Sequence, residues 1–179
     1  MIKTNILPDN YQIVREYDIL KNKKDLKIMY LITFILFIPF IVLYFFIFNH
    51  FNLNFIYLLL IYLLIIIFHE LIHGLFFKLG GKSKLKFNLQ LQAASCGAPG
   101  YYYKRNYYML IGLSPFLIIS PILITLFFIY HKSLLFYILL MIHTAGCSCD
   151  FYIFFELLKY DKKTLIEDTG IKMIFYNEK

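Results

Sequence analysis

Residues 55 to 79 read FIYLLLIYLLIIIFHELIHGLFFKL, an apolar stretch that carries two histidines and a glutamate. An apolar run of about 20 residues is what a membrane-spanning helix requires. On such a helix His69 and His73 are four residues apart and project from one face, and Glu70 lies next to that face. Ionisable side chains are costly in lipid when they are unpaired, so we expect these three to face protein, water or a metal ion.

The run from His69 to His73 has the HExxH spacing, with which two imidazoles on one helix share a zinc ion. Zinc with three protein ligands keeps a position for water, and an adjacent carboxylate can take the proton of that water. The pattern predicts metal-assisted hydrolysis with Glu70 as the catalytic base. A set of hydrogen-bonded structural groups is the alternative. A haem site is excluded, because imidazoles four residues apart cannot lie on opposite faces of a porphyrin.

The composition indicates a membrane protein: 60% of the 179 residues are hydrophobic, 16% are charged, and the mean hydropathy is +0.67. We predict an all-α fold that forms a single integral membrane domain over residues 1–179. Its four membrane spans are predicted at residues 28–48, 55–79, 107–130 and 134–158.

The basic residues predict the orientation of these spans. They gather before the first span, between the second and third, and after the fourth, whereas the link around Asn49 to Asn54 has no Lys or Arg. Loops rich in Lys and Arg stay in the cytoplasm, so both termini and the middle loop are predicted to be cytoplasmic. The net charge of +7 is therefore assigned to topology and to contact with membrane lipid, and no nucleic-acid partner is expected.

The third metal ligand must reach the depth of the two histidines, and Asp150 does so. His69 lies nine residues before Lys78, and Asp150 lies nine residues before Lys159, in spans that both run inward. At about 1.5 Å per residue these positions share one layer of the membrane. The small residues from Thr144 to Cys149 favour close helix packing at this point. Four other side chains compete for the role of third ligand: His143, Glu156, Cys147 and Cys149.

The middle loop predicts a short cytoplasmic β-hairpin between the second and third spans. Residues 84–92 alternate polar and apolar side chains, which is typical of a half-buried strand. A turn signal follows at residues 96–100, and Tyr101 to Tyr103 are predicted as the returning strand. Such an edge could hold a substrate in extended form by strand pairing, or the hairpin could simply lie on lipid headgroups.

The HExxH run and the segment Gly146-Cys147-Ser148-Cys149-Asp150 together resemble the membrane zinc metalloproteases of the site-2 protease type. They are more similar to a zincin peptidase family of small bacterial membrane proteins, because Phe151 stands where site-2 proteases usually have Gly.

The resemblance implies a zinc metalloendopeptidase of a bacterial cell membrane that cuts peptide or transmembrane protein substrates. In this reading His69, His73 and Asp150 bind Zn²⁺ and Glu70 is catalytic. The alternative is a non-catalytic membrane protein whose metal site is structural or a sensor that binds partner helices.

Overall fold

The computed structural model describes residues 3–18, 21–48, 53–81, 83–90 and 93–179. The helices are α1 (Lys23–Ile47), α2 (Phe55–Leu79), α3 (Arg105–Ile129), α4 (Leu134–Gly146) and α5 (Ser148–Leu157). The strands are β1 (Lys3–Thr4), β2 (Tyr11–Tyr17), β3 (Lys86–Gln90), β4 (Ala93–Gly97), β5 (Tyr102–Lys104), β6 (Leu165–Asp168) and β7 (Met173–Glu178). Most of the link from Asn49 to Asn54, and Leu91 and Gln92 of the predicted hairpin, lie outside the described residues.

Four helical segments are long and apolar enough to cross a membrane, the fourth being α4 and α5 taken together. They are consistent with the predicted multi-pass membrane protein. Asn22 and Asn54 cap the first two helices, since each side chain accepts a hydrogen bond from a backbone N–H of the first turn. The fourth span is interrupted at Cys147, whose ψ of 7° departs from helical geometry and separates α4 from α5.

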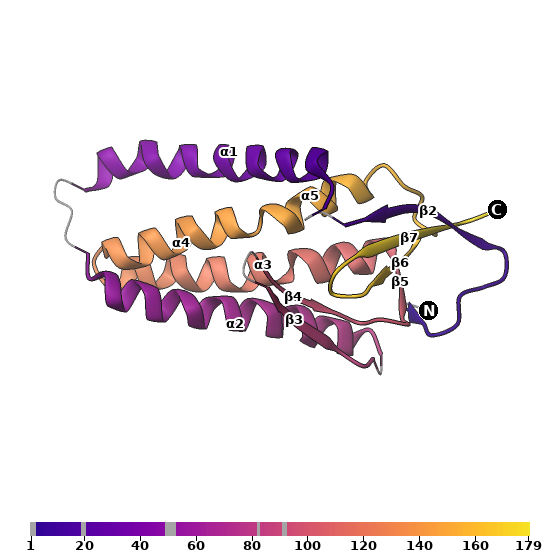
Figure 1. The fold of residues 1–179 in the computed structure, drawn as a ribbon. Helices are drawn as coiled ribbons and strands as arrows, with labels where there is room; N and C mark the ends of the chain where they lie inside the picture. Colours follow the sequence, from indigo (N-terminus) through magenta and orange to yellow (C-terminus); the bar gives the residue numbers. More distant parts are fainter. Residues whose placement is uncertain (1–2, 19–20, 49–52, 82, 91–92) are drawn as a thin grey trace.

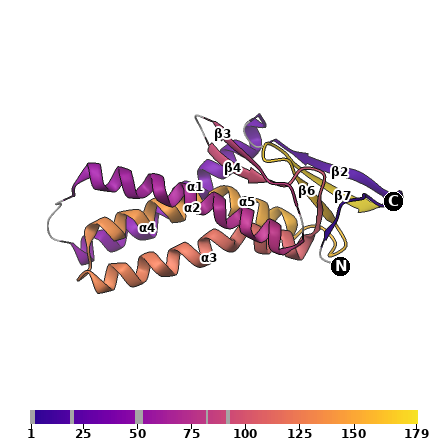
Figure 2. The ribbon, with the colours of Figure 1, turned by 90° about the horizontal axis from the view of Figure 1, so that it is seen from below.

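The helices lie side by side, and the five-stranded sheet lies at one end of them together with both chain termini, while the β3–β4 hairpin runs alongside the half of the helices nearest that end (Figure 1). Helix α1 packs against α4 and α5, whereas α2 packs against α3 and β4. Viewed from below, β2, β6 and β7 continue past the ends of the helices (Figure 2). The molecule therefore has a helical part, formed by α1 to α5, and a strand-rich end, formed by the five-stranded sheet and the adjoining hairpin.

The prediction of an all-α protein is wrong in one respect, because the two terminal segments form an antiparallel sheet with β5. The sheet has five strands in the order β1-β5-β6-β7-β2. Its strands are short and contain charged residues, so they resemble surface segments in the sequence. They are held by pairing between distant parts of the chain, such as Tyr11 of β2 with Glu178 of β7. Pairing between distant segments produces no periodic pattern of apolar residues within any one segment, so the sequence did not predict this sheet.

The hairpin between α2 and α3 is present, but its second strand was predicted wrongly. Strand β3 pairs with β4, from Lys86 opposite Gly97 to Gln90 opposite Ala93. Tyr102 and Tyr103, which were predicted as the returning strand, instead pair with β1 and β6 in the large sheet. The chain turns away from the hairpin at Gly100, whose φ of +77° suits glycine.

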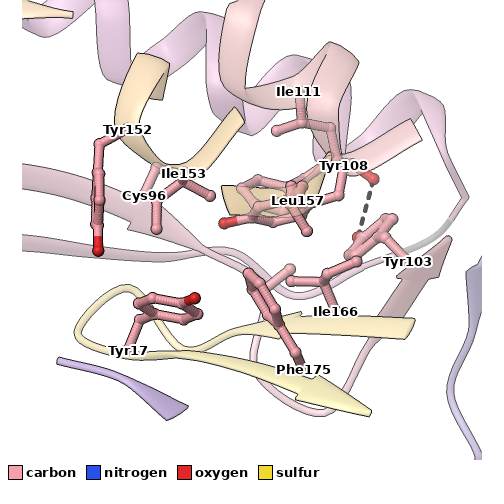
Figure 3. Packing of buried hydrophobic residues seen from close by; sticks show 12 residues of the cluster. Tyr17, Cys96, Tyr103, Tyr108, Ile111, Tyr152, Ile153, Leu157, Ile166 and Phe175 are labelled. Atoms are coloured by element: carbon pink, nitrogen blue, oxygen red, sulfur yellow. Dashed lines mark hydrogen bonds between the residues drawn. The ribbon is translucent and has the colours of Figure 1, made fainter. Parts of the chain in front are cut away.

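The main core fills the junction between the sheet and the helices (Figure 3). Tyr17, Tyr103, Phe175 and Ile166 reach it from the strands and are at most 1% exposed. Side chains from α3 and α5 meet them from the other side, including the fully buried Leu157. Burial of apolar side chains from both parts fixes the sheet against the ends of the helices.

Candidate metal centre

Helix α2 presents the two histidines of the HExxH run on one face, one turn apart. The ring centroids of His69 and His73 are 4.8 Å apart, and their Nε2 atoms are separated by 3.1 Å. Two imidazole nitrogens at this distance can bind the same ion.

Helix α5 brings Asp150 to the same point from its first turn. Its Oδ2 lies 3.4 Å from His69 Nε2, and its Oδ1 lies 3.5 Å from His73 Nε2. Asp150 follows the interruption at Cys147, and the side chains on either side of that residue are small. The structure thus brings together the three residues that the sequence selected as metal ligands.

The spacing of these donor atoms fits zinc. In a tetrahedral site with metal–ligand distances near 2.0–2.1 Å, neighbouring donor atoms lie about 3.3 Å apart. The three separations here are 3.1, 3.4 and 3.5 Å. Two imidazoles and a carboxylate are also a donor set that zinc commonly takes.

The tautomer of His73 suits a metal ligand. Its Nδ1 lies 2.9 Å from the backbone oxygen of Ile111 in α3, which can only accept a hydrogen bond. The Nδ1–H therefore donates to that oxygen, and in the neutral ring Nε2 keeps its lone pair. This lone pair is directed at His69 and Asp150, where a cation would satisfy it.

Glu70 stands beside the three donor atoms with an unsatisfied oxygen. Its Oε2 is buried and has no hydrogen-bond partner among the described residues. A buried acceptor without a partner is costly unless a water molecule or a ligand completes it. Glu70, His69, His73 and Asp150 all line one cavity of about 810 Å³, which is large enough to hold several side chains of a substrate.

The walls of this cavity come from both parts of the molecule. Helices α2, α3, α4 and α5 contribute most of the lining, and further lining residues come from α1, the hairpin, the ends of β6 and β7 and the turn between them, among them Leu89, Ser95 and Ile171. The hairpin reaches α2 because Gly74 has no side chain. A Cβ there would lie 3.0 Å from Leu85 Cδ1 and 3.4 Å from Cys96 Sγ.

Asp168 is a cavity residue that the sequence did not identify as part of the site. It ends β6, and its Oδ2 accepts a hydrogen bond of 2.5 Å from the hydroxyl of Tyr108, another lining residue. Its Oδ1 accepts from the backbone N–H of Gly170 at 2.7 Å. Burial raises the pKa of Asp168 to about 6, despite these hydrogen bonds. Only the folding of the sheet brings it near α2, so spacing along the chain gives no signal for it.

The four side chains that compete with Asp150 for the role of third ligand differ in where they lie. Glu156 is turned elsewhere, since its carboxylate accepts a 2.9 Å hydrogen bond from Tyr17 and pairs with Lys159. Cys149 lines the cavity, but among the described residues it belongs to no group that could hold a metal ion. His143 and Cys147, together with His69, form a second group of side chains that could hold a metal ion.

One comparison with known proteins gives a match. The model of a family described as "Putative zincin peptidase" matches residues 62–165, which is more than half of the chain and includes His69, Glu70, His73 and Asp150. Zincin peptidases are zinc enzymes, so the match implies a zinc cofactor, in agreement with the donor set. No curated protein and no solved structure matches the chain significantly.

Proposed function

Because the chain belongs to this zincin peptidase family, we propose that it is a membrane-embedded zinc metallopeptidase that hydrolyses peptide bonds of membrane or membrane-proximal substrates. One observation carries the proposal. Three donor atoms from two separate helices have the spacing of a tetrahedral zinc site, and the unsatisfied carboxylate of Glu70 faces the same cavity.

In the proposed reaction His69, His73 and Asp150 hold the zinc ion. When bound there, zinc would supply a Lewis acid for the scissile carbonyl and would lower the pKa of a water molecule, so that the water could lose a proton at neutral pH. Glu70 accepts the proton of the attacking water and then delivers it to the leaving amine. The Ile111 carbonyl keeps His73 in the tautomer that binds, through the Nδ1 hydrogen bond.

We propose that the strand-rich end faces the cytoplasm of a bacterial cell. Lys78 at the end of α2, Lys104 and Arg105 at the start of α3, and Lys159 after α5 all lie at this end of the helices. The positive-inside rule places such residues on the cytoplasmic side. Both termini belong to the sheet and would lie there too.

An extended substrate is expected to bind along β3. In the described chain β3 pairs only with β4, so its other edge is available to a peptide. Leu89 of β3 is 87% exposed and lines the cavity. Strand pairing would hold a peptide bond open to attack, whereas a helical peptide bond is shielded by its own hydrogen bonds.

The test replaces Glu70 by Gln. Removal of a general base typically costs about 10²–10⁴-fold in rate. We expect Glu70→Gln protein to bind zinc as the unchanged protein does and to cleave a membrane-protein substrate at least about 100-fold more slowly. Metal analysis and a cleavage assay in proteoliposomes measure the two quantities. Undiminished cleavage by Glu70→Gln would sink the mechanism, and zinc binding without cleavage by the unchanged protein would favour the non-catalytic alternative.

A further inference from the structure

A second group of three metal-ligating side chains lies beside the first site. The proposed reaction does not use these three side chains together. His69 of α2 and His143 and Cys147 of the fourth span each offer one ligand atom, and these atoms lie within 4.8 Å of one another. His69 belongs to both groups. The second group therefore touches the first at a shared imidazole.

The distances within this group suit a metal ion with a thiolate ligand. His143 Nε2 lies 3.8 Å from Cys147 Sγ, and the rings of His69 and His143 are 5.7 Å apart between centroids. Tetrahedral zinc, with Zn–S near 2.3 Å and Zn–N near 2.0 Å, separates a sulfur and a nitrogen ligand by about 3.5 Å. A thiol hydrogen bond to His143 would explain the first contact, but it would not require a second imidazole from another helix beside it.

The orientation of His143 repeats that of His73. Its Nδ1 lies 3.3 Å from the hydroxyl oxygen of Ser120 in α3, which can accept the Nδ1–H. Nε2 then keeps its lone pair and faces Cys147. An outer hydrogen bond that orients the imidazole is the arrangement found around metal-binding histidines.

The group is largely buried, and two of its three residues line the cavity. His143 is 3% exposed and Cys147 is fully buried, yet His143 and His69 both line the cavity that holds the first site. Cys147 does not itself line the cavity, but its Sγ lies 3.8 Å from Nε2 of the lining residue His143.

We propose that His69, His143 and Cys147 form a second position for a thiophilic divalent cation such as Zn²⁺, Co²⁺ or Cd²⁺. Binding replaces the thiol proton of Cys147, which leaves to water through the cavity, and the resulting thiolate bonds to the ion. Because His69 is shared, an ion in the second position disturbs the first. Resting on the proposed function, this sharing predicts that excess metal inhibits peptide hydrolysis.

The experiment is a titration of the purified, metal-free, full-length protein in detergent with Co²⁺, followed by near-ultraviolet absorption. A thiolate ligand gives a sulfur-to-cobalt charge-transfer band, which nitrogen and oxygen ligands do not. We expect this band in the unchanged protein and in Asp150→Asn, whose first site is weakened. We expect Cys147→Ser and His143→Gln to lose it.

Cys149→Ser is the matched control, since Cys149 lies two residues from Cys147 and lines the same cavity. It should keep the band. A band that disappears with Cys149→Ser and persists with Cys147→Ser would overturn the proposal, and so would the absence of a band from both the unchanged protein and Asp150→Asn. The absorption band does not depend on peptidase activity. The metal-binding result can therefore be interpreted even if the protein does not hydrolyse peptides.

Discussion

The helical part and the strand-rich end are built in opposite ways, although both line the same cavity. Each helix is formed from one continuous run of residues, and α2 alone supplies His69, Glu70 and His73. The five-stranded sheet is assembled from the first residues of the chain, the last residues and a short strand between the hairpin and α3. The chemistry of the helices is therefore local in sequence, whereas the wall that the sheet places beside it is not.

The two regions also differ in where their charged side chains lie. In the helical part, His69 and His73 of α2 and Asp150 of α5 converge on one point inside the protein. At the sheet, charged side chains form exposed pairs, such as Lys163 of the loop before β6 with Glu178 of β7 at 3.0 Å. Exposed pairs of this kind contribute little to stability, so the sheet depends on the core beneath it. Charged groups at the site therefore come mainly from α2 and α5, and the sheet adds one buried acid to the same cavity, Asp168 of β6.

The largest effect is expected where the two helices meet at the site. Asp150→Ala removes a proposed zinc ligand. Changes to outer-sphere partners already cost about 10–100-fold in metal affinity, so we expect zinc binding to weaken by more than about 100-fold. Competition with a chromophoric chelator measures it. Glu156→Ala is the control, because this acid is on the same helix but bonds to Tyr17 and Lys159. Equal affinity in the two variants would contradict the assignment of Asp150.

The next largest effect is expected where the hairpin meets the sheet. A Cβ at Gly97 would lie 2.1 Å from the backbone nitrogen of Gly170, so Gly97→Ala must push the hairpin away from the β6–β7 turn. Overpacking costs about 1–3 kcal/mol, and we expect a loss of this order in thermal unfolding. Hydrogen exchange should rise at Asn88 and Ser95, whose side chains donate to the oxygen of Gly170.

Gly112→Ala is the control for this substitution, since a Cβ there meets nothing within 4 Å. Its position inside α3 should even make the variant slightly more stable, because alanine is the better helix former. Equal destabilisation by both variants would show that the contact at Gly97 does not hold the hairpin.

An effect of similar size is expected at the hydrogen bond between α1 and α5. The hydroxyl of Tyr152 donates to Asp25 Oδ1 at 2.8 Å, and the other oxygen of this 2% exposed carboxylate has no partner among the described residues. Tyr152→Phe leaves the buried acid without its donor, which costs about 1–3 kcal/mol. We expect lower thermal stability with unchanged zinc affinity. A simultaneous loss of zinc would show that α1 supports the site directly.

The smallest effect is a change in pH dependence at Asp168. Its pKa is raised from 3.8 to about 6, so between these values the folded protein binds more protons than the unfolded chain. Stability therefore falls as the pH rises from about 4 to about 6 and is level on either side. Asp168→Asn should remove this slope in metal-free protein, as measured by thermal unfolding at several pH values. A slope that survives the substitution would assign the pH dependence to other groups.

The sequence predicted well what depends on neighbours along the chain. Four long apolar helices were predicted from hydropathy and length, and the structure contains them. Depth counting from Lys78 and Lys159 selected Asp150, and the structure places it 3.4 Å from His69. Counting works here because the rise per residue of a helix is fixed.

The sequence failed where segments pair across long distances. Tyr101 to Tyr103 follow a turn signal after an alternating run, which is typical of a returning strand. The segment nevertheless pairs with β1 and β6, because Tyr103 gains burial in the core at the junction. Local pattern cannot reveal which of several partners offers a strand the larger buried surface.

By itself the sequence determined the helical part and selected the candidate donor residues, since hydropathy fixes the helices and their regular rise fixes which side chains share a face and a depth. Only the tertiary structure decided the sheet, the true partner of β3, and the positions of Asp168, His143 and Cys147 around the site. These depend on contacts between segments far apart in the chain, whose free energy is gained only when the whole molecule has folded.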